Sequence, residues 1–182
     1  MAEEVRLPFC TIVSLHRSSL WYHVCKSCER VLPELRNSGG KHFTSMENGE
    51  ECHHCLGNLL KNGIGSSRKR VYRLLLSVAT EDKVMVVVAF DRAARVLMGC
   101  SADDFYKFVS HDPSVVELAG KLLEGHMVDI VLKHPKSGHA QHMRATSILP
   151  LSCNFQPVFQ TIEKAYAKIS NNICLVGSSL MH

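Results

Sequence analysis

The stretch WYHVCKSCER (21–30) places two cysteines two residues apart, and EECHHCLGN (50–58) repeats the same spacing. Two residues between cysteines form a tight knuckle that directs both sulfurs at one point, and two such knuckles complete a tetrahedral thiolate shell. The four ligands are Cys25, Cys28, Cys52 and Cys55. The pattern predicts one structural zinc ion, because four protein ligands leave no open position for a reacting water.

Other interpretations of the four thiols stay open at this stage. A redox role for one pair would need a strand-to-helix context that the surrounding sequence lacks. His53 or His54 could replace one cysteine as a ligand, and four unrelated buried thiols are the least specific alternative. Turn-rich pieces at 37–43 and 46–51 favour a zinc ribbon, which we expect to span residues 21–60.

Size and composition are those of one globular domain, which we place at residues 1–170. The chain has 182 residues, of which 46% are hydrophobic and 21% charged. Its net charge of +4 permits a polyanionic partner without requiring one. We find no secretory signal, and the longest apolar run, Val84–Phe90, is too short to cross a membrane. We therefore expect no membrane contact and a reducing compartment, cytosol or nucleus. The basic SSRKR (66–70), typical of a solvated linker or a nuclear import signal, is compatible with the nucleus.

The order of the predicted elements indicates a small β-barrel. Strands are expected at 7–16, 71–79, 84–90, 126–134 and 140–151, with a basic connector at 61–70. Helices are expected at 91–99, 101–112 and 113–125, each bounded by a cap residue, a proline or a glycine. Five strands with a helical connection between the third and the fourth predict a mainly β OB-fold barrel carrying the ribbon as an insert.

A last helix is predicted at 154–170, followed by a flexible tail at 171–182. Large apolar residues recur in this helix at alternating spacings of four and three. They are Phe155, Phe159, Ile162, Tyr166 and Ile169. Such a stripe either packs on its own barrel or forms the seam of a helix bundle with other subunits, and the sequence favours neither.

The combination of an early barrel strand, an aromatic pair, a four-cysteine ribbon and the strand YRLLLSV (72–78) resembles the carboxy-terminal domain of the large subunit of replication protein A. The resemblance covers about 7–169. It implies an OB-fold with an inserted zinc ribbon, single-stranded DNA as ligand, and a terminal helix that joins a bundle between subunits. The helix-rich middle looks closer to diverged relatives, such as the carboxy-terminal barrel of shieldin subunit 2 or the amino-terminal domain of noxin. These imply a larger share of protein contacts.

Single-stranded nucleic acid is held by cations that follow the phosphates and by aromatic faces on which bases stack. The candidate residues of this chain are Trp21, Tyr22, Arg68, Lys69, Arg70, Tyr72, Arg73, Lys83 and Arg92. Phe90 is also aromatic, but we expect it in the core because it ends a buried strand. Trp21 and Tyr22 alternate on a short strand, so at most one of them faces outward.

Two functions follow from these predictions. One is a zinc-containing OB-fold module that binds single-stranded DNA in repair or replication as part of a multi-subunit complex. The other is an interaction scaffold of a repair complex with weak or no DNA binding. We find no motif for catalysis and expect no enzyme, although a nuclease built on Asp91, Asp103 and Asp129 is conceivable.

Overall fold

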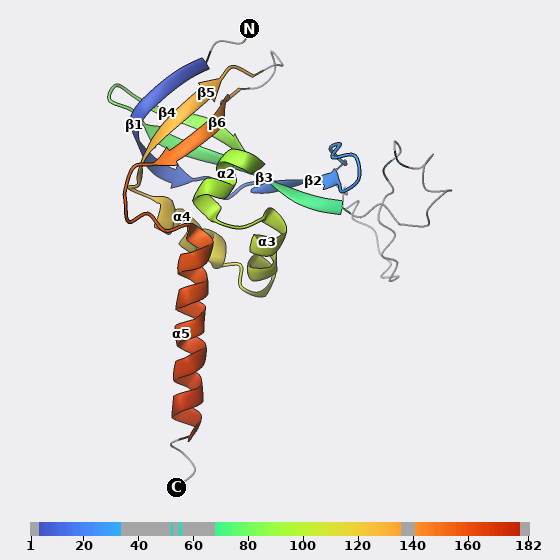
Figure 1. Ribbon diagram of the computed structural model, residues 1–182, viewed down its shortest axis with the longest axis vertical. Coiled ribbons are helices and arrows are strands. Elements are labelled where there is room, and N and C mark those ends of the chain that lie inside the picture. The colour runs from blue at the N-terminus through green and yellow to red at the C-terminus, as the bar shows by residue number, and fades with distance from the viewer. Residues whose placement is uncertain (1–3, 34–51, 53–54, 56–67, 136–140, 179–182) are drawn as a thin grey trace.

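The computed structural model describes residues 4–33, 52, 55, 68–135 and 141–178 (Figure 1). Its elements, in chain order, are β1 (Glu4–Leu15), β2 (Trp21–Cys25), β3 (Arg68–Ala79), β4 (Val84–Phe90), α2 (Asp91–Met98), α3 (Ala102–His111), α4 (Val115–Leu123), β5 (Met127–Lys133), β6 (Met143–Pro150) and α5 (Val158–Ser178).

Five of the strands close into a barrel. β1 pairs antiparallel with β3 on one side and with β5 on the other, and β3–β4 and β5–β6 are also antiparallel. A short parallel pairing of β4 with β6, from Val87↔Met143 to Ala89↔Ala145, completes the ring. The helices α2, α3 and α4 lie between the third and fourth barrel strands. This arrangement confirms the predicted OB-fold.

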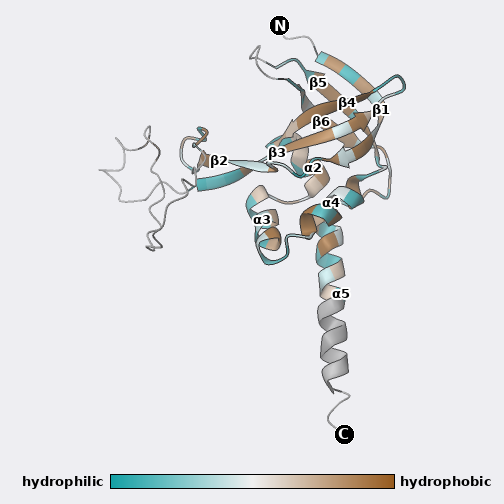
Figure 2. Cartoon of the chain, turned by 180° about the vertical axis from the view of Figure 1, so that it is seen from behind, coloured by the Kyte–Doolittle hydropathy of each residue, from teal (hydrophilic) through white to brown (hydrophobic). Residues whose placement is uncertain are grey.

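The barrel interior follows the alternation of the strands. On β3 the inward residues Tyr72, Leu74, Leu76 and Val78 are fully buried, and the residues that follow each of them along the strand are partly exposed. Figure 2 shows apolar residues concentrated in the barrel strands, whereas the end of β3 that pairs with β2 is hydrophilic. The barrel is therefore a filled core, and ligands must use its outer faces.

The basic segment 68–70 differs from its prediction as a connector. It is the start of β3, which extends beyond the barrel and pairs with β2 from Trp21↔Tyr72 to Cys25↔Arg68. The main-chain hydrogen bonds of this pairing account for the extended conformation, and composition does not reveal them. Residues 61–67, and the ribbon other than 21–33, Cys52 and Cys55, lie outside the described part of the chain.

The helix boundaries follow local signals. Ser101 caps α3 as predicted, because its side chain accepts a hydrogen bond from the Asp104 N–H (3.1 Å). Asp91 is the first residue of α2 and not its cap; the residue before it, Phe90, is extended. Gly99 ends α2 with a φ of 76°, a left-handed conformation that favours glycine.

The terminal helix is displaced from its prediction. α5 starts at Val158, just after Pro157, and continues to Ser178, so the predicted tail is helical through that residue. Figure 1 shows α5 projecting away from the barrel. In the described part of the chain, no helix has both the length and the apolar character needed to cross a membrane.

Candidate metal centre and nucleic-acid interface

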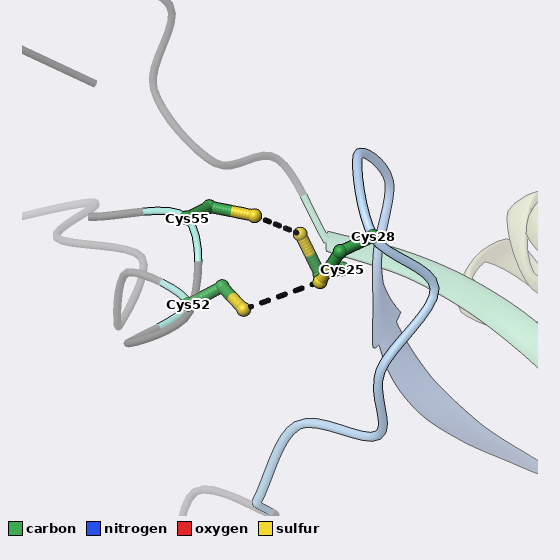
Figure 3. Close-up of side chains that lie close together, drawn as sticks. All are labelled: Cys25, Cys28, Cys52 and Cys55. Atoms are coloured by element: carbon green, nitrogen blue, oxygen red, sulfur yellow. Dashed lines mark hydrogen bonds between the residues drawn. The ribbon is translucent and has the colours of Figure 1, made fainter. Parts of the chain in front are cut away.

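The four predicted cysteine ligands come together at the outer end of β2 (Figure 3). Their sulfur atoms all lie within 4.8 Å of one another. The Sγ atoms of Cys25 and Cys55 are 3.7 Å apart, and those of Cys28 and Cys52 are 3.5 Å apart. A tetrahedral zinc site with Zn–S bonds of about 2.3 Å has sulfurs about 3.8 Å apart. The spacing therefore fits an ion of this size.

Main-chain hydrogen bonds shape both knuckles. In the first, the Cys25 N–H donates to the Arg30 carbonyl and the Glu29 N–H to the Cys25 carbonyl, each at 2.9 Å. Glu29 has a φ of 55°, which closes this turn. In the second, the Cys55 N–H donates to the Cys52 carbonyl at 2.8 Å. Both pairs of sulfurs are thus directed by the backbone.

The electrostatics of the cluster are compatible with a bound cation. Without one, hydrogen bonds with Cys28, and then with Cys25, raise the pKa of the Cys55 thiol to about 12. Four thiols at this spacing cannot ionise together unless a positive charge compensates them. Cys25 and Cys52 are buried beside Leu32 in a small core of their own. The donor set and the closed geometry can hold a metal ion and are compatible with structural zinc.

The paired strands β2 and β3 have two faces that the sequence could not separate. Residues directly opposite in an antiparallel pair share a face, and neighbours along a strand alternate. Tyr22, Val24, Lys69, Val71 and Arg73 therefore lie on one face, which is continuous with the outside of the barrel. The opposite face carries Trp21, His23, Arg68, Arg70 and Tyr72.

The outer face gathers an aromatic and basic group at the ends of β3 and β4. Arg73 is paired with Phe90, and the rings of Tyr22 and Phe90 meet edge to face with centroids 6.2 Å apart. The Arg144 guanidinium of β6 lies over the Phe90 ring, with Cζ 4.9 Å from the centroid. We call Tyr22, Arg73, Phe90 and Arg144 the outer cluster. It combines stacking surfaces with two cations, as a single-strand groove requires.

The opposite face is occupied by α3. The Arg70 guanidinium lies over the Tyr106 ring, with Cζ 3.5 Å from the centroid, and pairs with Asp103 at 3.2 Å. The Trp21 ring meets Tyr106 edge to face, with centroids 5.5 Å apart. These contacts hold the β2–β3 extension on the helices, and they engage Trp21 and Arg70 within the chain.

Tyr72 must be removed from the stacking candidates. It is fully buried, its hydroxyl donates to the Ser101 carbonyl (3.2 Å), and burial raises its pKa. No face of its ring is open to a base in this conformation. Tyr72 faces the barrel interior because it alternates with the outward residues of β3.

The remaining predicted cations are dispersed. Lys69 shares the face of Tyr22 and pairs with Glu29 at 3.5 Å, whereas Arg68 lies on the opposite face. Arg92 is exposed in the first turn of α2, two residues after Phe90. Lys83 lies in the β3–β4 turn, at the other end of β4 from Phe90. The structure thus brings Lys69, Arg73 and Tyr22 to one face and separates Lys83 from them.

Most of the predicted partner stripe on α5 packs on its own domain. Ile162 is buried, and Phe155 and Tyr166 pack against the same core. The Phe159 and Tyr166 rings meet Phe108 of α3 at centroid distances of 5.2 and 5.9 Å. Of the two alternatives left open by the sequence, these contacts favour packing on the chain's own domain, and a role of these four residues in partner binding stays a prediction. The side chain of Ile169 lies outside the described part of the chain.

The three aspartates of the nuclease alternative have separate partners. Asp91 accepts the Tyr72 N–H and pairs with Arg95, Asp103 pairs with Arg70, and Asp129 accepts the Phe9 N–H. In the described part of the chain, metal-ligating side chains gather in threes or more only at the four cysteines.

Arg144 was not among the residues predicted from the sequence, and Phe90 was expected in the core. The outer position of Phe90 could have been inferred from alternation, since Ala89 faces inward. Arg144 reaches Phe90 through the parallel pairing of β4 with β6, which joins segments far apart in the sequence.

No known protein family matches the sequence, and neither does any curated protein. Solved structures do match. One is a chain of a replication protein A heterotrimer bound to single-stranded DNA, with a TM-score of 0.62 and 17% identity over 95% of this chain and 36% of that chain. Another is yeast RPA bound to single-stranded DNA, with a TM-score of 0.54 and 14% identity over 92% of this chain and 86% of that chain. This chain thus spans only 36% of the first of these structures. At such identities the likeness shows a shared fold, and the fold is that of OB domains from replication protein A.

Proposed function

We propose that this chain is a single-stranded DNA-binding OB-fold module with one structural zinc ion. It would act in the nucleus, in DNA repair or replication, as part of a multi-subunit complex. The observation that supports this function best is the outer cluster on β3 and β4, the face that OB-folds use for oligonucleotides. The two similar structures described above are themselves bound to single-stranded DNA.

The chemistry of the outer cluster suits a single strand of any sequence. Base stacking on an aromatic ring contributes about 1–3 kcal/mol per base and tolerates every base. Arg73 is the strand partner of Phe90 and the Arg144 guanidinium lies over its ring, so both cations can neutralise phosphates near a stacked base. The partly exposed Tyr22 ring adds a second surface beside it.

The experiment is fluorescence anisotropy with labelled oligo(dT) and the full chain at several salt concentrations. Arg73→Glu should weaken binding and reduce the salt slope by roughly one phosphate contact. Lys83→Glu changes the net charge equally at a site away from the outer cluster and is the matched control. If both variants weaken binding equally, the attraction is diffuse and the proposed site is wrong.

Stacking needs its own test. Phe90→Ala should weaken oligo(dT) binding by about 1–3 kcal/mol, with little change in salt slope. Since Phe90 is half-buried, thermal unfolding must show that the variant is folded. An affinity equal to that of the wild type would remove Phe90 from the site.

The second candidate function, an interaction scaffold, is favoured by α5. Its first two turns are docked on the domain, yet the helix continues to Ser178. In the sequence the four-and-three spacing of apolar residues continues past Tyr166 through Ile169, Ile173 and Val176. We propose that this distal part of α5 joins a helix bundle with other subunits.

The two functions are separated by variants of the distal helix. Ile173→Asp should abolish assembly with the partner subunits and leave oligo(dT) binding of the isolated chain intact. Phe159→Asp is unsuitable, because Phe159 packs on Phe108 and its loss would disturb the fold. No measurable oligo(dT) binding by the folded wild-type chain, with assembly retained, would favour the scaffold.

A further inference from the structure

A second surface of the barrel is exposed and apolar, away from the outer cluster. Its members are Phe9 (69% exposed), Val84 (63%), Leu149 (59%), Met127 (46%) and Leu151 (36%). They come from β1, β4, β5 and the end of β6, and all but Val84 lie on the paired strands β1, β5 and β6 or directly after them. We call these five residues the apolar patch.

The strand register shows that Met127, Leu149 and Leu151 are adjacent, and that Ala79 and Thr11 lie between them and Val84. One row crosses the barrel from Val84 to Ala79, then to Thr11 and Met127. The Leu151 N–H donates to the Met127 carbonyl at 3.0 Å and extends this row. In the next row Leu149 is paired with Asp129, whose carboxylate accepts a hydrogen bond from the Phe9 N–H. A contiguous apolar surface of this kind is uncommon unless a partner covers it.

Phe9 is exposed, and its backbone has a strained conformation. It lies at an irregularity of β1, between Leu7 and Cys10, with a φ of 52°. A bulky residue rarely adopts this left-handed conformation. Its N–H donates to Asp129 Oδ1 at 2.9 Å, which fixes the bulge and turns the ring to solvent. A glycine would fit the bulge with less strain, so the ring itself needs an explanation.

The same stretch of β1 is poorly suited to pairing with an added strand. Pro8 has no N–H, and the Phe9 N–H is already used by Asp129. Prolines and bulges are typical of strand edges that resist pairing. A ligand of the apolar patch must therefore be recognised through side chains, as an amphipathic helix is.

The charged residues around the apolar patch indicate what kind of helix would fit it. The Asp129 carboxylate lies within the apolar patch, beside Leu149. Glu81 and Asp82 are exposed in the turn that precedes Val84, and Glu124 precedes Gly125, whose N–H donates to the Ile12 carbonyl. These four carboxylates outnumber the flanking cations Arg6 and Lys83, although the whole chain carries a net charge of +4.

From these observations we propose that the apolar patch binds a basic amphipathic helix of a protein partner. Large apolar side chains of that helix contact Phe9, Leu149 and Met127, and a lysine or arginine faces Asp129. Nucleic acid fits this surface poorly, because the carboxylates repel phosphates. Val84 and Phe90 are the two ends of β4, about 20 Å apart at 3.3 Å per residue, so both surfaces can be occupied together.

The test is a selection from a displayed library of helical peptides on the immobilised full chain, with counter-selection on Leu149→Asp. Leu149 is mostly exposed, so this variant should fold normally, which thermal unfolding checks. The expected peptides carry lysine or arginine beside leucine or phenylalanine at helical spacing. Anisotropy with one labelled peptide should show binding weakened at least about tenfold by Leu149→Asp, the loss of a central contact. Val96→Asp, an exposed apolar residue on α2, is the control that should change nothing.

Asp129→Asn tests the charge, because the amide oxygen can still accept the Phe9 N–H. The Asp129→Asn change should weaken peptide binding by about 2–5-fold, as the loss of an exposed ion pair does. Four results would overturn the proposal. Three of them are the lack of any peptide that distinguishes the wild type from Leu149→Asp, selected peptides that are acidic, and self-association of the chain that Leu149→Asp abolishes. The last result would assign the apolar patch to a second copy. Competition of oligo(dT) with the peptide would likewise reassign it to nucleic acid.

Discussion

The packing of α5 against the end of α2 can be tested at one glycine. Gly99 has a φ of 76°, and a Cβ added to it would lie 2.4 Å from the Cβ of Pro157. Carbon atoms in contact lie about 3.5–4.0 Å apart, so Gly99→Ala must displace the residue that leads into α5. The left-handed backbone costs an alanine about 1–2 kcal/mol. Overpacking of this kind adds about 1–3 kcal/mol.

Gly125 supplies the matched control. It has a similar φ of 81°, but an added Cβ meets nothing within 4 Å. Gly125→Ala should therefore lower the free energy of unfolding by the backbone cost alone, about 1–2 kcal/mol. Gly99→Ala should lower it by about 2–5 kcal/mol, the sum of both effects.

Urea unfolding followed by circular dichroism measures both variants against the wild type. Pro157→Gly removes the opposing Cβ, so in the double variant with Gly99→Ala the steric part should be recovered. Equal losses for Gly99→Ala and Gly125→Ala would refute the reasoning, because they would mean that Pro157 does not pack on Gly99. In that case α5 would not be fixed at its start.

Three further predictions concern the metal, acid stability and the two faces of the β2–β3 extension. Metal analysis should find one zinc ion per chain. The Cys52→Ser variant should lose zinc binding, and its β2–β3 extension should be less stable. Hydrogen bonds, first of all from Ser114, hold the pKa of Asp112 below its ordinary value. The contribution of the Asp112 carboxylate to stability is therefore complete above its ordinary pKa. This contribution is lost as the pH falls through the lower pKa of the folded state. Unfolding titrations should show this loss below about pH 4, and a smaller loss in Asp112→Asn. Arg70→Gln should cost roughly 1 kcal/mol of stability and leave oligo(dT) affinity unchanged. Arg73→Gln should weaken oligo(dT) binding and leave stability unchanged.

Local chemistry made the four-cysteine cluster predictable. Each pair of cysteines is set by a knuckle of a few residues, and the backbone hydrogen bonds at Cys25 and Cys55 lie within those knuckles. The barrel strands were predictable for a similar reason, because alternation of apolar residues reports a buried face directly. The cap at Ser101 and the glycine after α2 likewise act over one turn.

Contacts between distant segments were not predictable. Arg144 meets Phe90 only because β6 pairs in parallel with β4, and Arg70 meets Tyr106 only because α3 packs against the β2–β3 extension. The end of α5 was missed because the segment that starts with Asn171 and Asn172 was interpreted as a flexible terminal tail. Two such residues cost a helix of 21 residues only a fraction of a kcal/mol each.

The register of β2 connects the four-cysteine cluster to the outer cluster. Cys25 is the last residue of this five-residue strand, and Tyr22 lies three residues before it. A slip of one residue against β3 would turn Tyr22 under α3 and expose Trp21 in its place, because neighbouring residues lie on opposite faces. It would also turn the Cys25 sulfur away from that of Cys55, which is 3.7 Å distant in the observed register. Closure of the four-cysteine site and exposure of Tyr22 therefore require the same register, so the cysteines help to decide which aromatic ring the outer cluster presents.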